Sequence, residues 1–339
     1  MSVASIPMKT IGPVSIRGEI MTEEVMVPLA TFETPLWPST NRGAKVSRES
    51  GGWLATVVDN RMARSVTFQA PDATAALHII QHLSQRQSEL EQITQSTSRF
   101  ARLIDWHHQI IGSILILRFE FTTGDASGHN MVTKASDALM QWILQQYVNL
   151  QYISVSGNFC TDKKVSAVNG ILGRGKNVVV EMTIPEKICL ATLKTSPEKI
   201  VDLHIKKNLL GSIAAGSLRS ANAHFANILL AFYLATGQDA ANIVEGSQGI
   251  VHTQMQGNDL YFSATLPNII VGSIGNGKEL PFVKENLTLM NCDQAREPGE
   301  NAKRLAVICA ATTACCELSL LAALTNPSEL MRTHIAFER

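Results

Sequence analysis

Between residues 65 and 156, segments in which hydrophobic and polar residues alternate are separated by segments in which hydrophobic residues recur every three or four positions. Strict alternation is typical of a half-buried strand, whereas apolar residues repeated every three or four positions indicate a helix. Asp72 is the expected N-cap of the first helix, because its carboxylate can accept from the N–H groups of the first turn. The pattern predicts a strand over 65–70, a helix over 71–95, strands over 101–111 and 113–122 joined by a turn at Gly112, a helix over 126–147 and a strand over 151–156.

This order, β-α-β-β-α-β, is the split unit of ferredoxin-like folds. The flanking segments differ from it. Residues 1–64 have the pattern of short strands and loops, and no turn-rich linker separates the parts. After residue 165 we expect strands over 177–184 and 260–266, and Ala-rich helices near 212–236 and 301–324.

The expected fold class is therefore α+β. A large domain, formed by 1–64 and 157–339, would carry an inserted small ferredoxin-like domain, 65–156. A small unit inserted in this way is a candidate for hinged motion against the rest of the chain.

The composition fits a globular protein with a sizeable core. Of the 339 residues, 45% are hydrophobic and 17% are charged, which excludes a disordered chain. The formal net charge is zero, so nothing in the charge balance favours nucleic-acid binding. Six cysteines form no CxxC pair and no zinc-type spacing, so we expect reduced thiols in a cytoplasmic protein and no metal site.

Two segments bear on membrane attachment. The N-terminal residues lack a charged stretch followed by a long apolar one, so no signal peptide is expected. The run from Leu305 to Leu324 is rich in Ala, Thr and Cys and carries Glu317. This pattern favours a buried helix over a membrane span, so we expect no membrane partner.

Five polar strings interrupt the apolar elements. One of them is a turn that leads into a helix, and the N–H groups of a helix N-terminus suit a phosphate. The strings are VPLATFETPLWPSTNRG (27–43), TGDASGHNMV (123–132, the turn), SGNFCTDKK (156–164), NAHFANILLAFYLATGQD (222–239) and GSIGNGKELP (272–281).

Taken singly, each string has an ordinary explanation. Glu33 or Asp239 alone is more often a cap or a surface ion pair, a Lys pair is usually solvated, and His224 on an Ala-rich helix is more often a packing residue. Neither Gly-rich string is a Rossmann fingerprint. The chemistry alone indicates only an enzyme for an anionic, phosphate-bearing ligand.

Taken together and in order, the strings closely resemble class I 3-hydroxy-3-methylglutaryl-coenzyme A (HMG-CoA) reductases. The resemblance extends from about Ile11 to His334. It rests on PLATFET with STNRG, TGDASGHNMV, SGNFCTDKK with GRGK (173–176), KNLLGSIAAGS (207–217), NAHFAN with ATGQD, and TLPNIIVGSIGNGKELP (265–281). It implies an oxidoreductase of the mevalonate pathway that reduces HMG-CoA to mevalonate and CoA with two hydrides from NADPH.

The resemblance assigns chemistry to Glu33, Lys163, Asp239 and His334. Hydride attack on a thioester builds negative charge on oxygen, which the fixed cation Lys163 would stabilise. His334 would protonate the departing thiolate, and Glu33 would act as the acid toward the aldehyde. Asp239 would contact both Lys163 and Glu33, so that the cluster titrates as a unit.

The resemblance also assigns binding residues. The substrate contacts would be Arg64, Ser156, Asn158, Asp162, Lys164, Lys207, His224 and Asn227, and the CoA contacts Arg42, Ser39, Asn41 and Ser319. NADP(H) is the expected cofactor, with NAD(H) as the alternative, and Arg99 would bind the 2′-phosphate. The cofactor contacts would be Ser98, Arg99, Phe100, Asp125, Ser127, Gly128, Asn130, Gln238, Gly275 and Gly277.

The sequence departs from the family pattern at the cofactor loops. The usual DAMGMNM is DASGHNM here, so Ser127 and His129 replace two methionines. The usual GGGT is GNGK, which introduces Asn276 and Lys278. Lys278 is either a phosphate contact or an ordinary solvated loop lysine, and the preference for NADPH or NADH stays open.

The family's membrane anchor, helical N-terminal domain and ENVIG-type dimer segment have no counterpart in this sequence. Family members build each active site across two subunits, so the resemblance implies a homodimer or tetramer with shared sites. Two alternatives to HMG-CoA reduction are NAD-dependent oxidation of mevalonate and a non-catalytic acyl-CoA-binding homologue.

Overall fold

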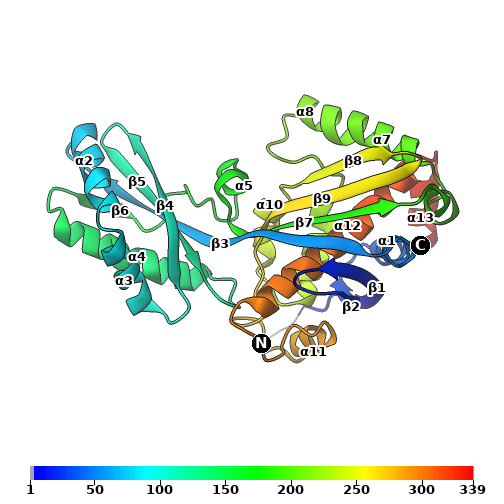
Figure 1. The fold of residues 1–339 in the computed structure, drawn as a ribbon, viewed down its shortest axis with the longest axis horizontal. Coiled ribbons are helices and arrows are strands. Elements are labelled where there is room, and N and C mark those ends of the chain that lie inside the picture. Colours follow the sequence, from blue (N-terminus) through cyan, green and yellow to red (C-terminus); the bar gives the residue numbers. More distant parts are fainter. Residues whose placement is uncertain (1–3, 339) are drawn as a thin grey trace.

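One long strand joins the two parts of the molecule. The computed structural model describes residues 4–338, except for the side chains of residues 333, 334, 337 and 338. Strand β3 (Trp53–Gln69) is 17 residues long and runs from the large unit into the small one (Figure 1). Its first half pairs with β7 (Gly175–Ile184), and its second half, from Met62 onward, pairs with β5 (Ile114–Thr122). Each unit has its own hydrophobic core.

The large unit is built on a sheet with the order β2-β1-β3-β7-β9-β8. All neighbouring strands are antiparallel except β1 and β3, which run parallel. The four strands not yet given bounds are β1 (Met8–Gly18), β2 (Glu23–Ala30), β8 (Ile250–Gln256) and β9 (Asp259–Ile269). Burial alternates along β7: Val178, Val180, Met182 and Ile184 are buried in the core, whereas Val179 and Glu181 between them are only partly buried.

Three helices fill the core of this unit: α1 (Leu36–Glu49), α9 (Phe225–Ala235) and α12 (Glu300–Leu324). Helices α1 and α12 cross so closely that a Cβ added at Gly43 would lie 2.0 Å from the carbonyl oxygen of Cys315. Among the described residues, α12 is the helix long and apolar enough to cross a membrane, but 94% of its most apolar window is buried inside the protein. The prediction that this run is a buried helix is confirmed.

The strands of the small unit follow one another along the chain in the predicted order. Its sheet has the order β4-β5-β3-β6, all antiparallel, with β4 (Arg102–Ile111) and β6 (Gln151–Ser154) at the edges. Helices α2 (Ala73–Ser84), α3 (Gln87–Thr97) and α4 (His129–Gln146) pack with it around one core. Asp72 caps α2 as predicted, since its Oδ1 accepts from the Ala75 N–H at 2.7 Å.

The prediction of one helix over 71–95 is wrong, because the helix is interrupted at Gln85 and Arg86. Arg86 leaves the helical conformation, and its guanidinium lies 4.3 Å from the ring centre of Trp142 and pairs with Glu89. The break allows α2 to pack on the sheet while α3 packs against α4. Both helices bury apolar residues in the same core, so the hydrophobic period continues across the break.

Two other predictions need correction. Residues 1–64 contain α1 and the first half of β3, not only short strands and loops; the Pro and Gly residues of α1 obscured its helical pattern. The helix expected near 212–236 is replaced by the short α8 (Ser212–Ala214), a loop and α9, and α8 continues a preceding π-helix, η2 (His204–Gly211). The remaining elements are α5 (Val168–Leu172), α6 (Glu186–Ile188), η1 (Cys189–Leu193), α7 (Pro197–Leu203), η3 (Ala240–Asn242), α10 (Ile243–Gly246), α11 (Pro281–Leu289) and α13 (Glu329–Glu338).

Candidate active site

Lys163 and Asp239 form an ion pair between two loops of the large unit. The Lys163 Nζ lies 2.6 Å from Asp239 Oδ2. Asp239 is held in place because it caps η3, where its Oδ1 accepts from the Ala241 N–H at 3.1 Å. The hydrogen bond that Lys163 donates to Asp239 raises the pKa of Lys163. Burial would raise the pKa of Asp239, but the Lys163 ammonium outweighs it and the pKa is lowered, so both groups are charged.

The loop that carries Lys163 has a strained backbone and is held in place by hydrogen bonds to buried side chains. Asn158, Thr161 and Lys163 all have a positive φ, which non-glycine residues rarely adopt. The Lys163 N–H donates to Glu245 Oε1 at 3.2 Å. Arg174 donates to the same Glu245 oxygen at 2.7 Å and to Asp162 Oδ1 at 2.8 Å. The loop is therefore fixed by a buried arginine that holds two carboxylates.

This anchoring network was not found in the sequence. Arg174 and Glu245 have side chains 1% and 0% exposed, and Asn242 also donates to Glu245, at 2.8 Å. Burial raises the pKa of Glu245 although Arg174 opposes it, whereas for Asp162 the attraction of Arg174 outweighs burial and lowers the pKa. Arg174 lies in the GRGK string, but nothing in the local pattern indicates Glu245 as its partner.

A pocket of about 510 Å³ opens beside this ion pair and is lined by both units. From the small unit come residues 126–131 and 133, at the N-terminus of α4, and from the large unit come 237–239 and the loop 274–276 with Lys278. Gly128 is the N-cap of α4 in a left-handed conformation, so the helix start carries no side-chain cap. The predicted cofactor residues that line this pocket are Ser127, Gly128, Asn130, Gln238 and Gly275.

Three residues in this region differ from the expectation. Asp125 does not line the pocket; its Oδ1 accepts from the Ala302 N–H at 2.9 Å and so caps the start of α12. Gln238 is buried, and its amide both donates to and accepts from the backbone of Gly272 at 3.0 Å. Gly277 packs its backbone against the carbonyl of Gly237. Asp125 and Gly277 therefore support the pocket without lining it, whereas Gln238 lines it with its amide group bound to the backbone.

His129 occupies a position that the sequence marked only as a substitution. It lines the same pocket, with its Nε2 3.8 Å from Asp162 Oδ1 and its Nδ1 3.3 Å from Ser127 Oγ. Burial and the nearby Arg174 lower the pKa of His129, so the neutral form is favoured at pH 7.

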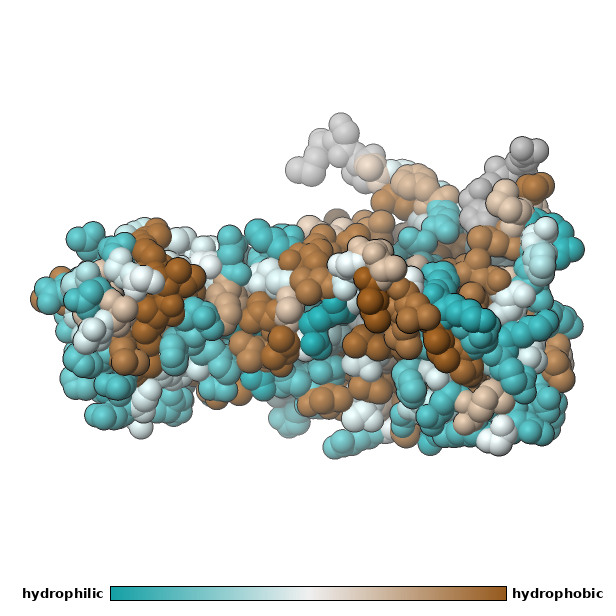
Figure 2. All heavy atoms as spheres, turned by 90° about the horizontal axis from the view of Figure 1, so that it is seen from above, coloured by the Kyte–Doolittle hydropathy of each residue, from teal (hydrophilic) through white to brown (hydrophobic). Residues whose placement is uncertain are grey.

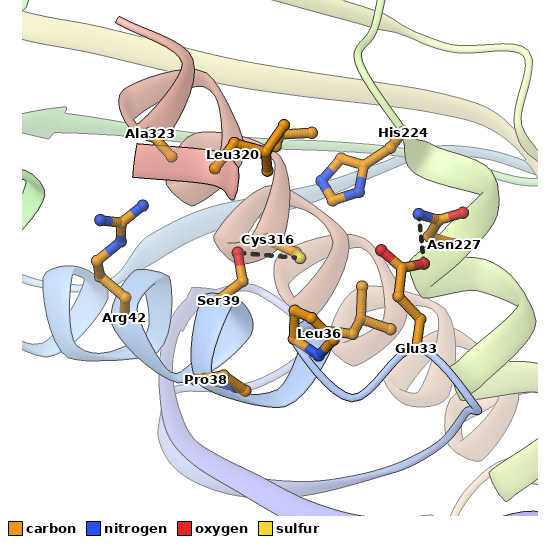
Figure 3. A pocket seen from close by; sticks show the side chains of 12 residues that line it. Glu33, Leu36, Pro38, Ser39, Arg42, His224, Asn227, Cys316, Leu320 and Ala323 are labelled. Atoms are coloured by element: carbon orange, nitrogen blue, oxygen red, sulfur yellow. Dashed lines mark hydrogen bonds between the residues drawn. The ribbon is translucent and has the colours of Figure 1, made fainter. Parts of the chain in front are cut away.

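A second pocket, of about 400 Å³, lies in the large unit between α1, α9 and α12 (Figure 3). Glu33 points into it, and its Oε2 accepts from Asn227 Nδ2 at 2.9 Å. On the opposite side Ser39 and Arg42 both donate to Ser319 Oγ, at 3.0 and 2.9 Å. Glu33 was predicted as a catalytic acid, Asn227 as a substrate contact, and Ser39 and Arg42 as CoA contacts. The structure brings these four side chains to one cavity.

His224 completes this second pocket. Its Nε2 lies 3.8 Å from Glu317 Oε2, and the fully buried Glu317 accepts the backbone N–H of His224 at 3.1 Å. Burial lowers the pKa of His224, but the neighbouring Cys316 and Glu317 outweigh it and raise the pKa to about 9. Burial raises the pKa of Glu317, and Lys207, on η2, lies close enough to this carboxyl to oppose the rise.

The expectation that Glu33, Lys163 and Asp239 form one cluster is not met within a single chain. Glu33 lines the pocket at α1, whereas Lys163 and Asp239 line the pocket at α4. The contacts expected between Asp239 and Glu33 are replaced by Asp239–Lys163 and Glu33–Asn227. His334 is on α13, and its side chain lies outside the described residues.

The other predicted residues divide among several places. Arg64 lies 3.9 Å from Asp162 and lines the α4 pocket, whereas Ser156, Asn158 and Lys164 are exposed on the Lys163 loop. Asn41 does not reach the second pocket, because its Oδ1 accepts from the Gly12 N–H at 2.8 Å.

Arg99 and Phe100 line a third cavity, together with Arg102 and Lys303. Ser98 turns toward Phe100, whose N–H donates to the Ser98 Oγ at 3.2 Å. This cavity therefore gathers three cations, on β4, on α12 and on the segment before β4, beside an exposed aromatic ring.

Asp105, His107 and Glu120 bring their ligand atoms within 4.8 Å of one another. Glu120, however, is paired with Arg61 at 2.6 Å and with Arg118 at 2.7 Å. These two guanidinium groups already neutralise the carboxylate, which disfavours a metal ion there.

Comparison with known proteins gives one consistent result. A family model described as hydroxymethylglutaryl-coenzyme A reductase matches residues 1–339. Proteins named 3-hydroxy-3-methylglutaryl-coenzyme A reductase from Pyrococcus abyssi and Aeropyrum pernix are each 42% identical, covering 98% of this chain and 82% and 79% of theirs. A solved class II 3-hydroxy-3-methylglutaryl-CoA reductase from Streptococcus pneumoniae, bound to NADPH, has the same fold: its TM-score is 0.77 at 20% identity, covering 96% of this chain and 86% of that one.

Proposed function

The chain belongs to the hydroxymethylglutaryl-coenzyme A reductase family, and we propose that it reduces HMG-CoA to mevalonate and CoA with two hydrides from NADPH. The observation that carries this proposal is the Lys163–Asp239 ion pair at 2.6 Å, facing a pocket formed by a helix N-terminus and two glycine loops. A fixed cation beside an anion-binding surface is what hydride transfer to a thioester requires.

Lys163 is the proposed electrostatic catalyst. Each hydride addition leaves negative charge on the carbonyl oxygen, and an ammonium already oriented toward that oxygen stabilises it without reorganisation. Asp239 and the Glu245–Arg174 network hold the ammonium and its backbone, so the orientation exists before the substrate binds. The structure thus supports a cation that is charged and preorganised.

The residues at the α4 pocket suit a nicotinamide dinucleotide. NADPH supplies the two hydrides when bound. The uncapped α4 N-terminus and residues 274–278 offer N–H groups to a phosphate, and the cavity with Arg99 and Phe100 offers cations and a stacking surface for the 2′-phosphate end. We accordingly assign residues 65–156 as a ferredoxin-like cofactor domain, with sheet order β4-β5-β3-β6, and 1–64 with 157–339 as the substrate domain.

The second pocket is the proposed site of the acyl-CoA. Glu33 would donate the proton that the aldehyde needs, and Asn227 orients its carboxyl group. Arg42 and Ser39 line the far side, where the CoA part would lie. Arg42 pairs with Glu329 on α13 at 2.7 Å, and this contact docks the helix that carries His334, the proposed proton donor to the CoA thiolate.

These assignments require a second copy of the chain. Glu33 and the Lys163–Asp239 pair line separate pockets, so a complete set of four arises if one subunit faces the α4 pocket with the Glu33 pocket of its partner. Apolar patches lie on the face seen in Figure 2, and η2 and α8 expose Ile205, Leu210 and Ile213. Patches of this kind mark protein–protein contacts, which supports a homodimer or tetramer with shared sites.

A steady-state assay of the purified full chain tests the proposed function. HMG-CoA should be reduced with NADPH, with NADH as the comparison cofactor. Lys163→Ala should lower kcat by a factor on the order of 10² to 10³ with little change in the KM for NADPH. Lys284→Ala is the matched control, because this lysine is exposed on α11 and lines neither pocket.

Other outcomes would identify the alternatives. Turnover of mevalonate and CoA with NAD, but none of HMG-CoA with either reduced cofactor, would indicate that the chain works in the oxidative direction. Binding of acyl-CoA without turnover under any condition would indicate a non-catalytic homologue. Full activity of Lys163→Ala would contradict the mechanism.

The six cysteines are free thiols, which supports a cytoplasmic location as part of this proposal.

A further inference from the structure

Lys278 lines the α4 pocket and forms no ion pair with the described residues. Its Nζ donates to the backbone carbonyl of Gly237, and among the described residues no carboxylate lies within ion-pair distance of it. The side chain lines the pocket and is half-buried, and burial lowers the pKa of its ammonium to about 8. A lysine on a solvated loop would not be desolvated in this way, because its ammonium would stay hydrated.

The N-terminus of α4 faces the same pocket. This helix is 18 residues long, and its first N–H groups have no side-chain cap. The loop that carries Lys278 is joined directly to this helix start: Ala126 and Ile274 form a β-bridge, and a Cβ on Gly272 would lie 2.3 Å from the Ser127 nitrogen. A lysine ammonium and an open helix N-terminus therefore converge on one cavity of about 510 Å³.

We propose that Lys278 adds a contact to the diphosphate of the nicotinamide dinucleotide beside the N-terminus of α4, and that this lysine makes cofactor affinity depend on pH. This inference rests on the proposed function. The diphosphate is the assigned group because Lys163 and Asp239, the reacting end, line the same pocket. The 2′-phosphate is assigned to Arg99, which lines a different cavity.

The position also links the cofactor loop to the reacting pair. Lys278 holds the carbonyl of Gly237, two residues before Asp239, and the backbones of Gly237 and Gly277 touch: a Cβ on either glycine would lie within 2.8 Å of the other's carbonyl oxygen. A diphosphate that engages the Lys278 ammonium would therefore contact the segment that presents Asp239. Lys278 is a binding and positioning residue in this scheme.

The sign of the pH dependence follows from the charges around the pocket. The charged or titratable groups that face it, besides Lys278 and the neighbouring Glu279, are Arg64, His129, Asp162, Lys163 and Asp239. The pKa of His129 is lowered and that of Lys163 is raised, so His129 is neutral and Lys163 is charged at pH 8. A bound diphosphate raises the pKa of Lys278, so binding above pH 8 takes up a proton and the affinity falls.

Titration of the full chain with NADPH and NADH, followed by nicotinamide fluorescence between pH 7 and 9.5, tests the proposal. Lys278→Met should raise the Kd for both cofactors about tenfold or more at pH 7, the scale of one charge-assisted hydrogen bond. The wild-type Kd should rise above pH 8, by up to about tenfold per pH unit. Lys284→Met, at an exposed lysine of α11, is the matched control and should bind like the wild type.

A charge-preserving variant separates the electrostatic effect from misfolding. Lys278→Arg should keep most of the affinity and lose the rise in Kd above pH 8, because a guanidinium stays charged throughout this range. Wild-type affinity in Lys278→Met would overturn the proposal, as would an unchanged pH profile in Lys278→Arg. Weaker binding of NADPH alone would move the contact to the 2′-phosphate and overturn the diphosphate assignment. A wild-type chain that binds neither cofactor would instead refute the proposed function itself.

Discussion

Arg174 holds two carboxylates at once, so its removal should be among the most destabilising single changes in the large unit. The side chain is 1% exposed and donates to Asp162 at 2.8 Å and to Glu245 at 2.7 Å. Each charge-assisted hydrogen bond contributes roughly 1.5–3 kcal/mol. Breaking a buried ion pair by removing one partner costs about 3–5 kcal/mol, because the remaining charge is left unpaired.

We therefore expect Arg174→Met to lower the free energy of unfolding by about 3–5 kcal/mol at pH 7. This is a large part of the roughly 5–15 kcal/mol typical of a folded domain. The deficit should shrink on acidification. Burial already raises the pKa of Glu245, and without Arg174 that pKa rises further, so a protonated Glu245 needs no cation in the folded state.

Urea unfolding followed by tryptophan fluorescence at pH 5 and pH 7 measures both effects. A double-mutant cycle with Glu245→Gln isolates the contribution of the ion pair. The double variant should lose clearly less unfolding free energy than the sum of the losses in the two single variants. A cost below about 1 kcal/mol for Arg174→Met, or additive losses in the cycle, would refute the reasoning that the pair is buried and coupled.

Three further changes test other parts of the structure. Because the pKa of His224 is raised to about 9 from 6.5, its contribution to stability should be complete below pH 6.5 and lost by about pH 9, and His224→Gln should remove this slope in unfolding measured across that range. Gly43→Ala should cost at least about 1–3 kcal/mol or prevent folding, since its Cβ would lie 2.0 Å from the Cys315 oxygen; a melting temperature like that of the wild type would contradict the α1–α12 crossing. Lys176→Met should be neutral or stabilising at pH 7, because burial lowers the pKa of this lysine to about 8 and its ammonium has one hydrogen-bond partner among the described residues, the Val271 carbonyl; a large drop in melting temperature would show that the charge is needed.

Local sequence patterns were sufficient to predict most of the strands and helices of the small unit. The alternation over 65–70 and 113–122, the turn at Gly112 and the cap at Asp72 all depend on residues within a few positions of one another. The break between α2 and α3 was missed because both helices bury the same face, so the hydrophobic period does not record the change of direction.

The candidate site divides in a similar way. The polar strings and the family resemblance pointed to Lys163 and Asp239, which do meet, and to Glu33 and Asn227, which also meet. No pattern in the sequence joins Arg174 to Glu245, because an ion pair between distant positions leaves no periodic signal.

The sequence by itself determined the family, the order of strands in the small unit and the residue types that are proposed to carry the chemistry. Only the tertiary structure decided that β3 is one strand shared by two sheets, that Glu33 and Lys163 line different pockets of one chain, and that Lys278 is a desolvated cation instead of a solvated one. The physical reason is the range of the interactions. Propensity, capping and turn chemistry act between neighbours in the chain, whereas strand pairing, burial and ion pairing act between residues that only the fold brings together.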